Sequence, residues 1–388
     1  MAGLFKYLKG DRILWIVTFL LCFVSLIAVY SSISGLAEKY RDGNTFYYLF
    51  RHGTMLGIGL CIMYFMHRIK FKYVYRISIL LIFLAAILLA FTLLFGNDIN
   101  DAKRWITIPI VNQSFQTSDL AKIALVLYVA RLVTKNQDLI RNFKLGVIPV
   151  LIPIGIICLL ILPANFSTAA LLFGTCFVLM FIAGVRVGHM AIVILAAVLS
   201  FGAMVGIAKV APEALPRLNT WSERISDFWS GESAENYQVQ KAELAIVSGG
   251  ILPDLPGKGA SPNYLPHLYS DMIYAFIIEE YGSVLGGVGL LFLYLVLFIR
   301  CMRISRRANS KFGAYVVIGL GFMIAFQAFV NMAVAVNLIP VTGQPLPLVS
   351  MGGTSIWFTC LALGLIQCVS RESQEQTAQQ SSHEFAVA

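Results

Sequence analysis

The chain contains a series of apolar stretches, each about 20 residues long, which follow one another almost to its end. A helix of that length rises about 1.5 Å per residue and crosses a hydrocarbon core about 30 Å thick. Only 13% of the residues are charged and 58% are hydrophobic, whereas about a quarter of a soluble domain is charged. The sequence therefore predicts an all-α, polytopic integral membrane protein. It predicts ten transmembrane helices, centred near Phe23, Leu56, Ala86, Val126, Ile154, Leu172, Ile194, Gly286, Ala325 and Ala362.

Basic residues are distributed unevenly between the predicted loops. With the N-terminus in the cytoplasm, the loops that fall inside carry most of them, including the cluster from Arg300 to Lys311. This positive-inside distribution orients membrane proteins, and it explains the net charge of +9 without nucleic-acid binding. An even number of helices puts both termini in the cytoplasm. The first apolar stretch is too long for a typical signal-peptide core, so we interpret it as an uncleaved helix.

One predicted outside loop, residues 209–270, is much longer than the others. It is the most polar region of the chain, yet it contains the apolar helical pattern "NYQVQKAELAIVSGG". A long loop in a compact protein is usually functional or disordered, and this pattern favours order. We expect a single membrane domain over residues 1–371 that includes this loop. The polar segment 372–388 is predicted to be a disordered cytoplasmic tail.

The stretch "LPHLYSDMIYAFIIEEYGSVLGG", residues 265–287, places three carboxylates in one predicted helix. Asp271 stands at its outer edge, and Glu279 and Glu280 are predicted roughly 12 to 14 Å deeper, near mid-bilayer. Carboxylates at that depth cost roughly 2.5 kcal/mol or more each. On a straight helix the two glutamates point about 80° and 180° away from Asp271, so the three cannot serve one site. Asp271 is interpreted either as a helix N-cap or as a catalytic group. The glutamates are interpreted as structural partners of another helix that line a polar cavity.

Lys122 is the one basic residue predicted within a transmembrane helix, so it needs a partner or an anionic ligand. Asp119 precedes it by three residues, which is close enough on a helix to form an ion pair.

Several other groups at the outer face are candidates for binding phosphate. Arg51 and Arg104 are predicted at helix ends, and Trp105 has the interfacial position that is usual for tryptophan. Lys258 lies in "SGGILPDLPGKGAS", which does not have the spacing of a P-loop. The seven cysteines lie in or beside predicted helices, and their number and spacing predict neither a disulfide framework nor a zinc site.

Five dispersed segments resemble the SEDS family of peptidoglycan polymerases, and they occur in the order typical of that family. They are "RWITIP" with "FQTSDLAK", "LPANFSTAA", "NYQVQKAELAIVSGG", "LPHLYSDMIYAFIIEEYGSVLGG" and "PVTGQPLPLVSMGGTS". The segments "SFQTS", "ILPANFSTAA" and "YSDMIYA" resemble those of the cell-division branch, FtsW, more than those of the elongation branch, RodA.

The resemblance implies a glycosyltransferase that polymerises lipid II at the outer face of the cytoplasmic membrane, for septal wall synthesis. The family's essential aspartate corresponds to Asp271, which would act as general base on the acceptor sugar. Undecaprenyl diphosphate would be the leaving group, and the product a β-1,4 strand formed with inversion. No cofactor is implied with certainty, and a divalent cation (Mg²⁺ or Mn²⁺) is the candidate. The implied partners are a class B penicillin-binding protein and other divisome membrane proteins. The substrate-binding candidates are Arg51, Arg104, Trp105, Asp119, Lys122, Lys258, Glu279 and Glu280.

The sequence departs from the family at three places. The segment from Gln116 to Asp119 keeps the acid but lacks the usual proline, Asn165 replaces an acid, and His267 stands where glutamate is usual. Two other functions remain open. A lipid II transporter would use carboxylates at mid-bilayer, and a non-enzymatic divisome scaffold would tolerate the loss of Asp271.

Overall fold

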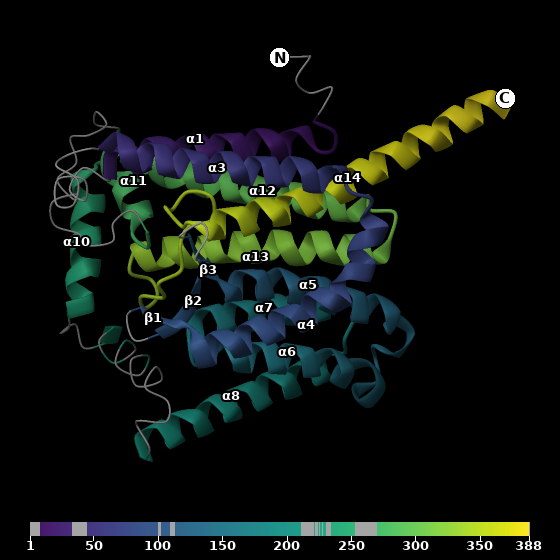
Figure 1. Cartoon of the computed structure of the whole chain (residues 1–388), viewed down its shortest axis with the longest axis horizontal. Helices are drawn as coiled ribbons and strands as arrows, with labels where there is room; N and C mark the ends of the chain where they lie inside the picture. Colours follow the sequence, from purple (N-terminus) through teal and green to yellow (C-terminus); the bar gives the residue numbers. More distant parts are fainter. Residues whose placement is uncertain are drawn as a thin grey trace.

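The computed structural model of the chain describes residues 8–32, 45–99, 102–108, 113–210, 234–252 and 270–387, together with residues 221, 224, 226, 228 and 229. Its long helices lie side by side in one bundle (Figure 1). They are α1 (Arg12–Ser32), α3 (Thr45–Arg68), α4 (Phe71–Phe95), α5 (Thr117–Lys135), α6 (Ile148–Ile161), α7 (Phe166–Ile182), α8 (Val187–Val210), α12 (Gly289–Arg306), α13 (Lys311–Ala335) and α14 (Thr354–Val387). Two short segments, η2 (Gln137–Leu139) and η3 (Phe143–Val147), join α5 to α6.

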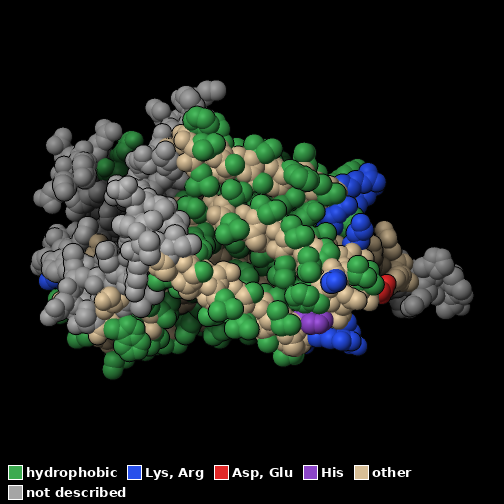
Figure 2. Space-filling view, turned by 90° about the horizontal axis from the view of Figure 1, so that it is seen from below, with side chains coloured by type: hydrophobic (Ala, Val, Ile, Leu, Met, Phe, Trp, Pro, Cys, Tyr) green, Lys and Arg blue, Asp and Glu red, His purple; other side chains and the backbone are tan. Residues whose placement is uncertain are grey.

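The bundle confirms the predicted all-α membrane architecture. Nine of the predicted centres lie within these helices, and the remaining one, Gly286, lies in a π-helical segment, η5 (Gly282–Val288), directly before α12. Within the described residues, eight helical segments are long and apolar enough to cross a membrane. Two more helices bring the number in the described residues to the predicted ten. They are α7, which is shorter with 17 residues, and α5, which carries the charged residues Asp119 and Lys122. Figure 2 shows hydrophobic side chains along the flank of the bundle and Lys and Arg gathered at one end.

A small antiparallel sheet, which the sequence did not predict, lies between α4 and α5. Its strands are β1 (Asn97–Ile99), β2 (Ala102–Ile108) and β3 (Gln113–Gln116), in that spatial order. Trp105 of β2 pairs with Gln116 of β3, so the sheet holds Trp105 beside the start of α5. The sheet and helix α10 (Ala234–Ser248) lie at the same end of the bundle (Figure 1). We call this the outer end, because these segments are predicted to face outside.

The segment after Asp271 is not the straight helix that the sequence predicts. Helix α11 (Ile273–Tyr281) ends at Gly282, whose φ of +72° breaks the helix. The chain then folds back. The Tyr274 hydroxyl donates to the carbonyl of Gly287 at 3.1 Å, although these residues would lie about 20 Å apart along a straight helix. The residues just after α10 hold the turn, since the carbonyl of Gly250 accepts a hydrogen bond from the backbone of Ser283 at 3.0 Å.

Because the chain folds back at Gly282, Glu279 and Glu280 lie directly before the turn and not within a helix that continues inward. The carboxylate of Glu280 accepts a hydrogen bond from Ser31, which is next to the last residue of α1 at the outer end. The prediction of mid-bilayer carboxylates is therefore wrong, because it assumed a helix that continues through Gly282.

The C-terminal segment also differs from the expectation of a disordered tail, since α14 continues to Val387. The first polar residues beyond residue 371 contact the end of the bundle that lies opposite the sheet. Glu372 accepts a hydrogen bond from the backbone of Phe71 at 2.7 Å, where α4 begins, and Glu375 pairs with Lys9 at 2.9 Å. These contacts fix the first turns beyond residue 371, and the rest of the helix projects from the bundle (Figure 1).

Candidate active site

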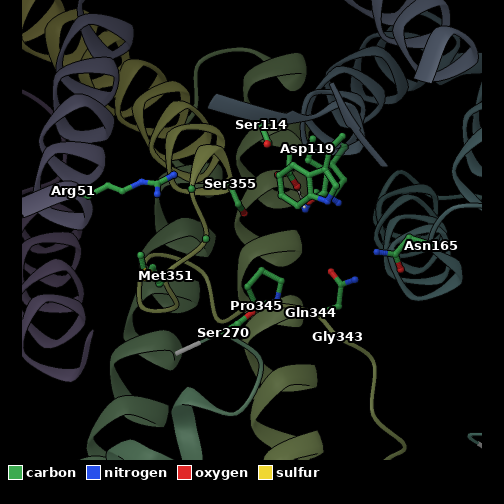
Figure 3. Close-up of a pocket in the computed structure, with 15 residues that line it drawn as sticks. Arg51, Ser114, Asp119, Asn165, Ser270, Gly343, Gln344, Pro345, Met351 and Ser355 are labelled. Atoms are coloured by element: carbon green, nitrogen blue, oxygen red, sulfur yellow. Dashed lines mark ion pairs between the residues drawn. The ribbon is translucent and has the colours of Figure 1, made fainter. Parts of the chain in front are cut away.

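A polar cavity of about 320 Å³ lies at the outer end of the bundle. Its walls come from α3, the sheet, the first turns of α5, the start of α7 and the loop between α13 and α14 (Figure 3). This loop belongs to the Pro- and Gly-rich segment 337–355. The lining residues are Arg51, Trp105, Ser114, Gln116, Asp119, Lys122, Asn165, Ser270, Gly343, Gln344, Pro345, Met351, Gly352, Gly353 and Ser355.

The predicted pair of Asp119 and Lys122 forms in the wall of this cavity. The ammonium of Lys122 lies 2.8 Å from Oδ1 of Asp119, and the two side chains are only 9% and 3% exposed. Lys122 also donates to Oε1 of Gln327 on α13 at 3.3 Å. Within the described residues, Oδ2 of Asp119 has no hydrogen-bond partner. The charge of Lys122 is thus offset by its neighbour, and a buried carboxylate oxygen remains available to a donor from a ligand.

Asp271 lies in the turn before α11, at the edge of the cavity between two lining residues, Ser270 and Gly343. A Cβ atom on Gly343, whose φ is +62°, would stand 3.7 Å from Oδ2 of Asp271. The side chain of Asp271 is half-buried. The interpretation of Asp271 as an N-cap is wrong, because the cap position is occupied by Met272 and no side chain caps the helix. The carboxylate of Asp271 makes no hydrogen bond or ion pair to the part of the chain that the structure describes.

Arg51 lies across the cavity from Asp119 and Asn165 (Figure 3). No carboxylate among the described residues pairs with its guanidinium. Trp105 also lines the cavity, as the register of the sheet allows. Of Arg104 the structure describes only the backbone, within β2, and Lys258 lies outside the described residues.

Glu279 and Glu280 do not line this cavity. They lie at the far end of α11 from Asp271 and are 6% and 1% exposed. The contact of Glu280 with Ser31 agrees with the structural pairing that the sequence indicated. The transporter hypothesis loses the mid-bilayer carboxylates on which it depended.

Sequence reasoning missed two amides that hold the cavity together. Gln327 and Asn331 stand four residues apart on α13 and are both buried, so they share one face. Gln327 donates to the carbonyl of Pro345 at 2.8 Å, and Asn331 donates to the carbonyls of Asp271 and Gln344, both at 2.8 Å. Polar amides on an otherwise apolar membrane helix were the available signal.

Asn165, which departs from the family pattern, takes a capping position in the structure. Its side-chain oxygen accepts a hydrogen bond from the backbone of Thr168 at 3.2 Å, at the start of α7. Gln344 donates to the hydroxyl of Thr168 at 2.9 Å. The loss of an acid at this position thus leaves a neutral, amide-rich wall opposite Arg51.

Across the described residues, no group of three or more His, Cys, Asp or Glu side chains is arranged to hold a metal ion. Mg²⁺ is often held by one or two carboxylates together with water and substrate phosphates. A divalent cation at this cavity would therefore take most of its ligands from water and phosphate, with Asp271 as the carboxylate that no cation among the described residues neutralises.

Comparison with known proteins places the chain in one family. Residues 11–375 match the FtsW/RodA/SpoVE family, described as "Cell cycle protein". "Stage V sporulation protein E" of Bacillus subtilis is 31% identical, over 95% of this chain and 99% of its own. "Probable peptidoglycan glycosyltransferase FtsW" of Geobacter sulfurreducens is 32% identical, over 90% of this chain and 92% of its own.

A solved structure supports the fold. A chain in the structure described as "Structural coordination of polymerization and crosslinking by a peptidoglycan synthase complex" superposes with a TM-score of 0.74 at 23% identity, covering 94% of this chain and 98% of that one. The similar identities to a sporulation protein and to an FtsW protein do not separate the branches. The chain belongs to the FtsW/RodA/SpoVE, or SEDS, family of multi-pass membrane proteins.

Proposed function

We propose that this protein is a peptidoglycan glycosyltransferase that polymerises lipid II into β-1,4 glycan strands at the outer face of the cytoplasmic membrane. The observation that carries the proposal is the carboxylate of Asp271, which has no partner among the described residues and lies at the edge of a polar cavity of about 320 Å³. Relatives named "Probable peptidoglycan glycosyltransferase FtsW" support the activity.

The reaction needs a base where the sugars of lipid II meet the membrane. Asp271 takes the proton of the acceptor's 4-hydroxyl, and that oxygen attacks the anomeric carbon of the donor. The bond from this carbon to the diphosphate breaks, undecaprenyl diphosphate leaves, and the anomeric configuration inverts. A general base contributes about 10²- to 10⁴-fold to such a step.

The two sides of the cavity suit different parts of the substrate. Arg51, whose charge no described carboxylate offsets, is the proposed contact for a diphosphate, because a guanidinium binds phosphate oxygens in pairs. Asp119, Lys122 and Trp105 are the proposed contacts for the sugars, since an ion pair of no net charge still offers both donors and acceptors. Roles for Arg104, Lys258, Glu279 and Glu280 in substrate binding stay predictions.

The activity is tested with purified, detergent-solubilised protein and lipid II, with and without the cognate class B penicillin-binding protein. Wild type is compared with Asp271→Asn, which keeps the size of the side chain but cannot act as a base. Asp138→Asn makes the same change at an exposed position on η2 and serves as the control. Polymer from wild type and Asp138→Asn, and none from folded Asp271→Asn, supports the proposal.

Other outcomes point elsewhere. Equal polymer from wild type and Asp271→Asn would mean that the base lies elsewhere. No polymer from any variant, even with the partner protein, would favour the transport or scaffold function.

We further propose that the enzyme acts in septal wall synthesis, with both termini in the cytoplasm and a class B penicillin-binding protein and other divisome proteins as partners. FtsW-named relatives support the septal role, and a solved structure that concerns polymerization and crosslinking in one complex supports the partner. A role in sporulation is the alternative, given the similarity to the sporulation protein. Depletion in dividing cells discriminates: filaments without septa support the division role, and a defect confined to spores refutes it.

A further inference from the structure

Asn331 connects the turn that carries Asp271 to the cavity loop. Its side chain is 1% exposed on α13, and its amide nitrogen donates to the carbonyl of Asp271 and to that of Gln344, both at 2.8 Å. A side-chain amide has two N–H donors, and both are used here. The reverse orientation of the amide would set an acceptor oxygen against two carbonyls, so the hydrogen bonds fix which way it points.

A second contact holds the residue before Asp271. The hydroxyl of Ser350 donates to the carbonyl of Ser270 at 2.6 Å and accepts a hydrogen bond from the backbone of Leu346 at 2.8 Å. Two successive carbonyls, those of Ser270 and Asp271, are thus held by groups outside α11. Because no side chain caps α11, these contacts hold the turn from outside the helix.

We propose that Asn331 is a positioning residue for the general base Asp271. It holds Asp271 at a fixed position relative to Gln344 in the cavity wall. This inference rests on the proposed glycosyltransferase function. The carboxylate of Asp271 has no partner of its own in the described chain, so its place at the edge of the cavity is set through its backbone. A reacting group displaced by about 1 Å can lose about 100-fold in rate. Asn331 therefore acts on the chemical step without touching substrate.

Gln327 provides a matched control on the same face of α13. It is also buried, at 5% exposure, and its amide donates to the carbonyl of Pro345 while its oxygen accepts from Lys122. It therefore holds the same loop but, within the described chain, has no hydrogen bond to the turn at Asp271, whose carbonyl accepts from Asn331 instead. Loss of either amide removes two hydrogen bonds from one buried environment, and only one of the two losses frees Asp271.

The test compares Asn331→Leu and Gln327→Leu in the full-length protein, with its partner transpeptidase present. Polymerisation of lipid II gives kcat and KM, and hydrogen–deuterium exchange follows the backbone of residues 270–276. We expect Asn331→Leu to lower kcat about 100-fold and to leave KM within about threefold, as for an interaction that matters in the transition state. Exchange in residues 270–276 should increase in Asn331→Leu and stay at the wild-type rate in Gln327→Leu.

Two results overturn the proposal: unchanged exchange over 270–276 in Asn331→Leu, or equal losses of kcat in the two variants. If Asn331→Leu does not fold, Asn331→Asp keeps the volume, replaces the NH₂ group by an oxygen, and is judged by the same measurements. If wild type itself makes no polymer, the proposed function fails, while the exchange experiment still decides whether Asn331 holds the turn.

Discussion

The two ends of α11 both carry acidic residues, but the protein holds them differently. At the start, the carboxylate of Asp271 has no partner in the described chain, while the carbonyls of Ser270 and Asp271 are both held. At the far end, Glu280 is buried and its carboxylate itself accepts a hydrogen bond from Ser31. A reacting group must be free to exchange a proton while its backbone stays fixed. A structural carboxylate is instead satisfied by its neighbours. The difference supports the proposal that chemistry takes place at the start of α11 and that the far end serves packing.

The largest expected effect separates the two ends directly. Asp271→Asn should lower the polymerisation rate by about 10²- to 10⁴-fold, the contribution of a general base, with no loss of thermal stability because its carboxylate bonds no described residue. Glu280→Gln should retain activity within about threefold, since Glu280 does not line the cavity and its proposed packing role contributes no transition-state interaction. Lipid II polymerisation and thermal unfolding of both variants check this. Comparable losses of activity would mean that both ends take part in catalysis.

The fold-back at Gly282 is tested by a methyl group. A Cβ atom at Gly286 would overlap the backbone oxygen of Ile277, so Gly286→Ala should lower the unfolding free energy by about 2 to 3 kcal/mol, as overpacking does. On a straight helix these residues would be about 13 Å apart, and the substitution would be harmless.

Gly155→Ala is the matched control for that substitution, because nothing lies within 4 Å of a Cβ atom there. In the interior of α6, alanine should stabilise by about 0.5 to 1 kcal/mol through helix propensity. Thermal unfolding of the two variants in the same detergent measures both effects. Equal behaviour would contradict the fold-back.

The sequence was sufficient to predict some features of the fold and the site but not others. Hydrophobic length located every long helix, and i, i+3 spacing identified the Asp119–Lys122 pair, because both depend only on local geometry. The break at Gly282 was missed because the hydrophobic pattern runs on through it. A glycine permits both a helix and a turn, and the backbone hydrogen bonds to Gly250 and Ile251, with that from Tyr274 to Gly287, select the turn. Asn331 was missed because its two partners, Asp271 and Gln344, come together only in the folded protein.

A substitution of Arg51 tests whether its charge, which no described carboxylate offsets, acts on the substrate. Arg51→Gln should raise KM for lipid II about tenfold and change kcat little, if the lost contact is a charge-assisted hydrogen bond to diphosphate worth about 1.5 kcal/mol. Higher salt should raise KM for wild type and have less effect on the variant. Steady-state kinetics at two ionic strengths measure this. A fall in kcat at constant KM would move Arg51 from binding to the chemical step.

The smallest expected effect lies at the far end of α11. Ser31→Ala removes the hydroxyl that donates to Glu280, and the loss of one hydrogen bond to a buried acceptor costs about 1 to 2 kcal/mol. Activity should be unchanged, because the turn at Asp271 keeps its contacts with Asn331 and Ser350. Thermal unfolding and polymerisation of this one variant measure both quantities. A loss of activity without a loss of stability would show that the two ends of α11 are coupled. In that case the helix of nine residues would transmit a displacement at Glu280 to Asp271.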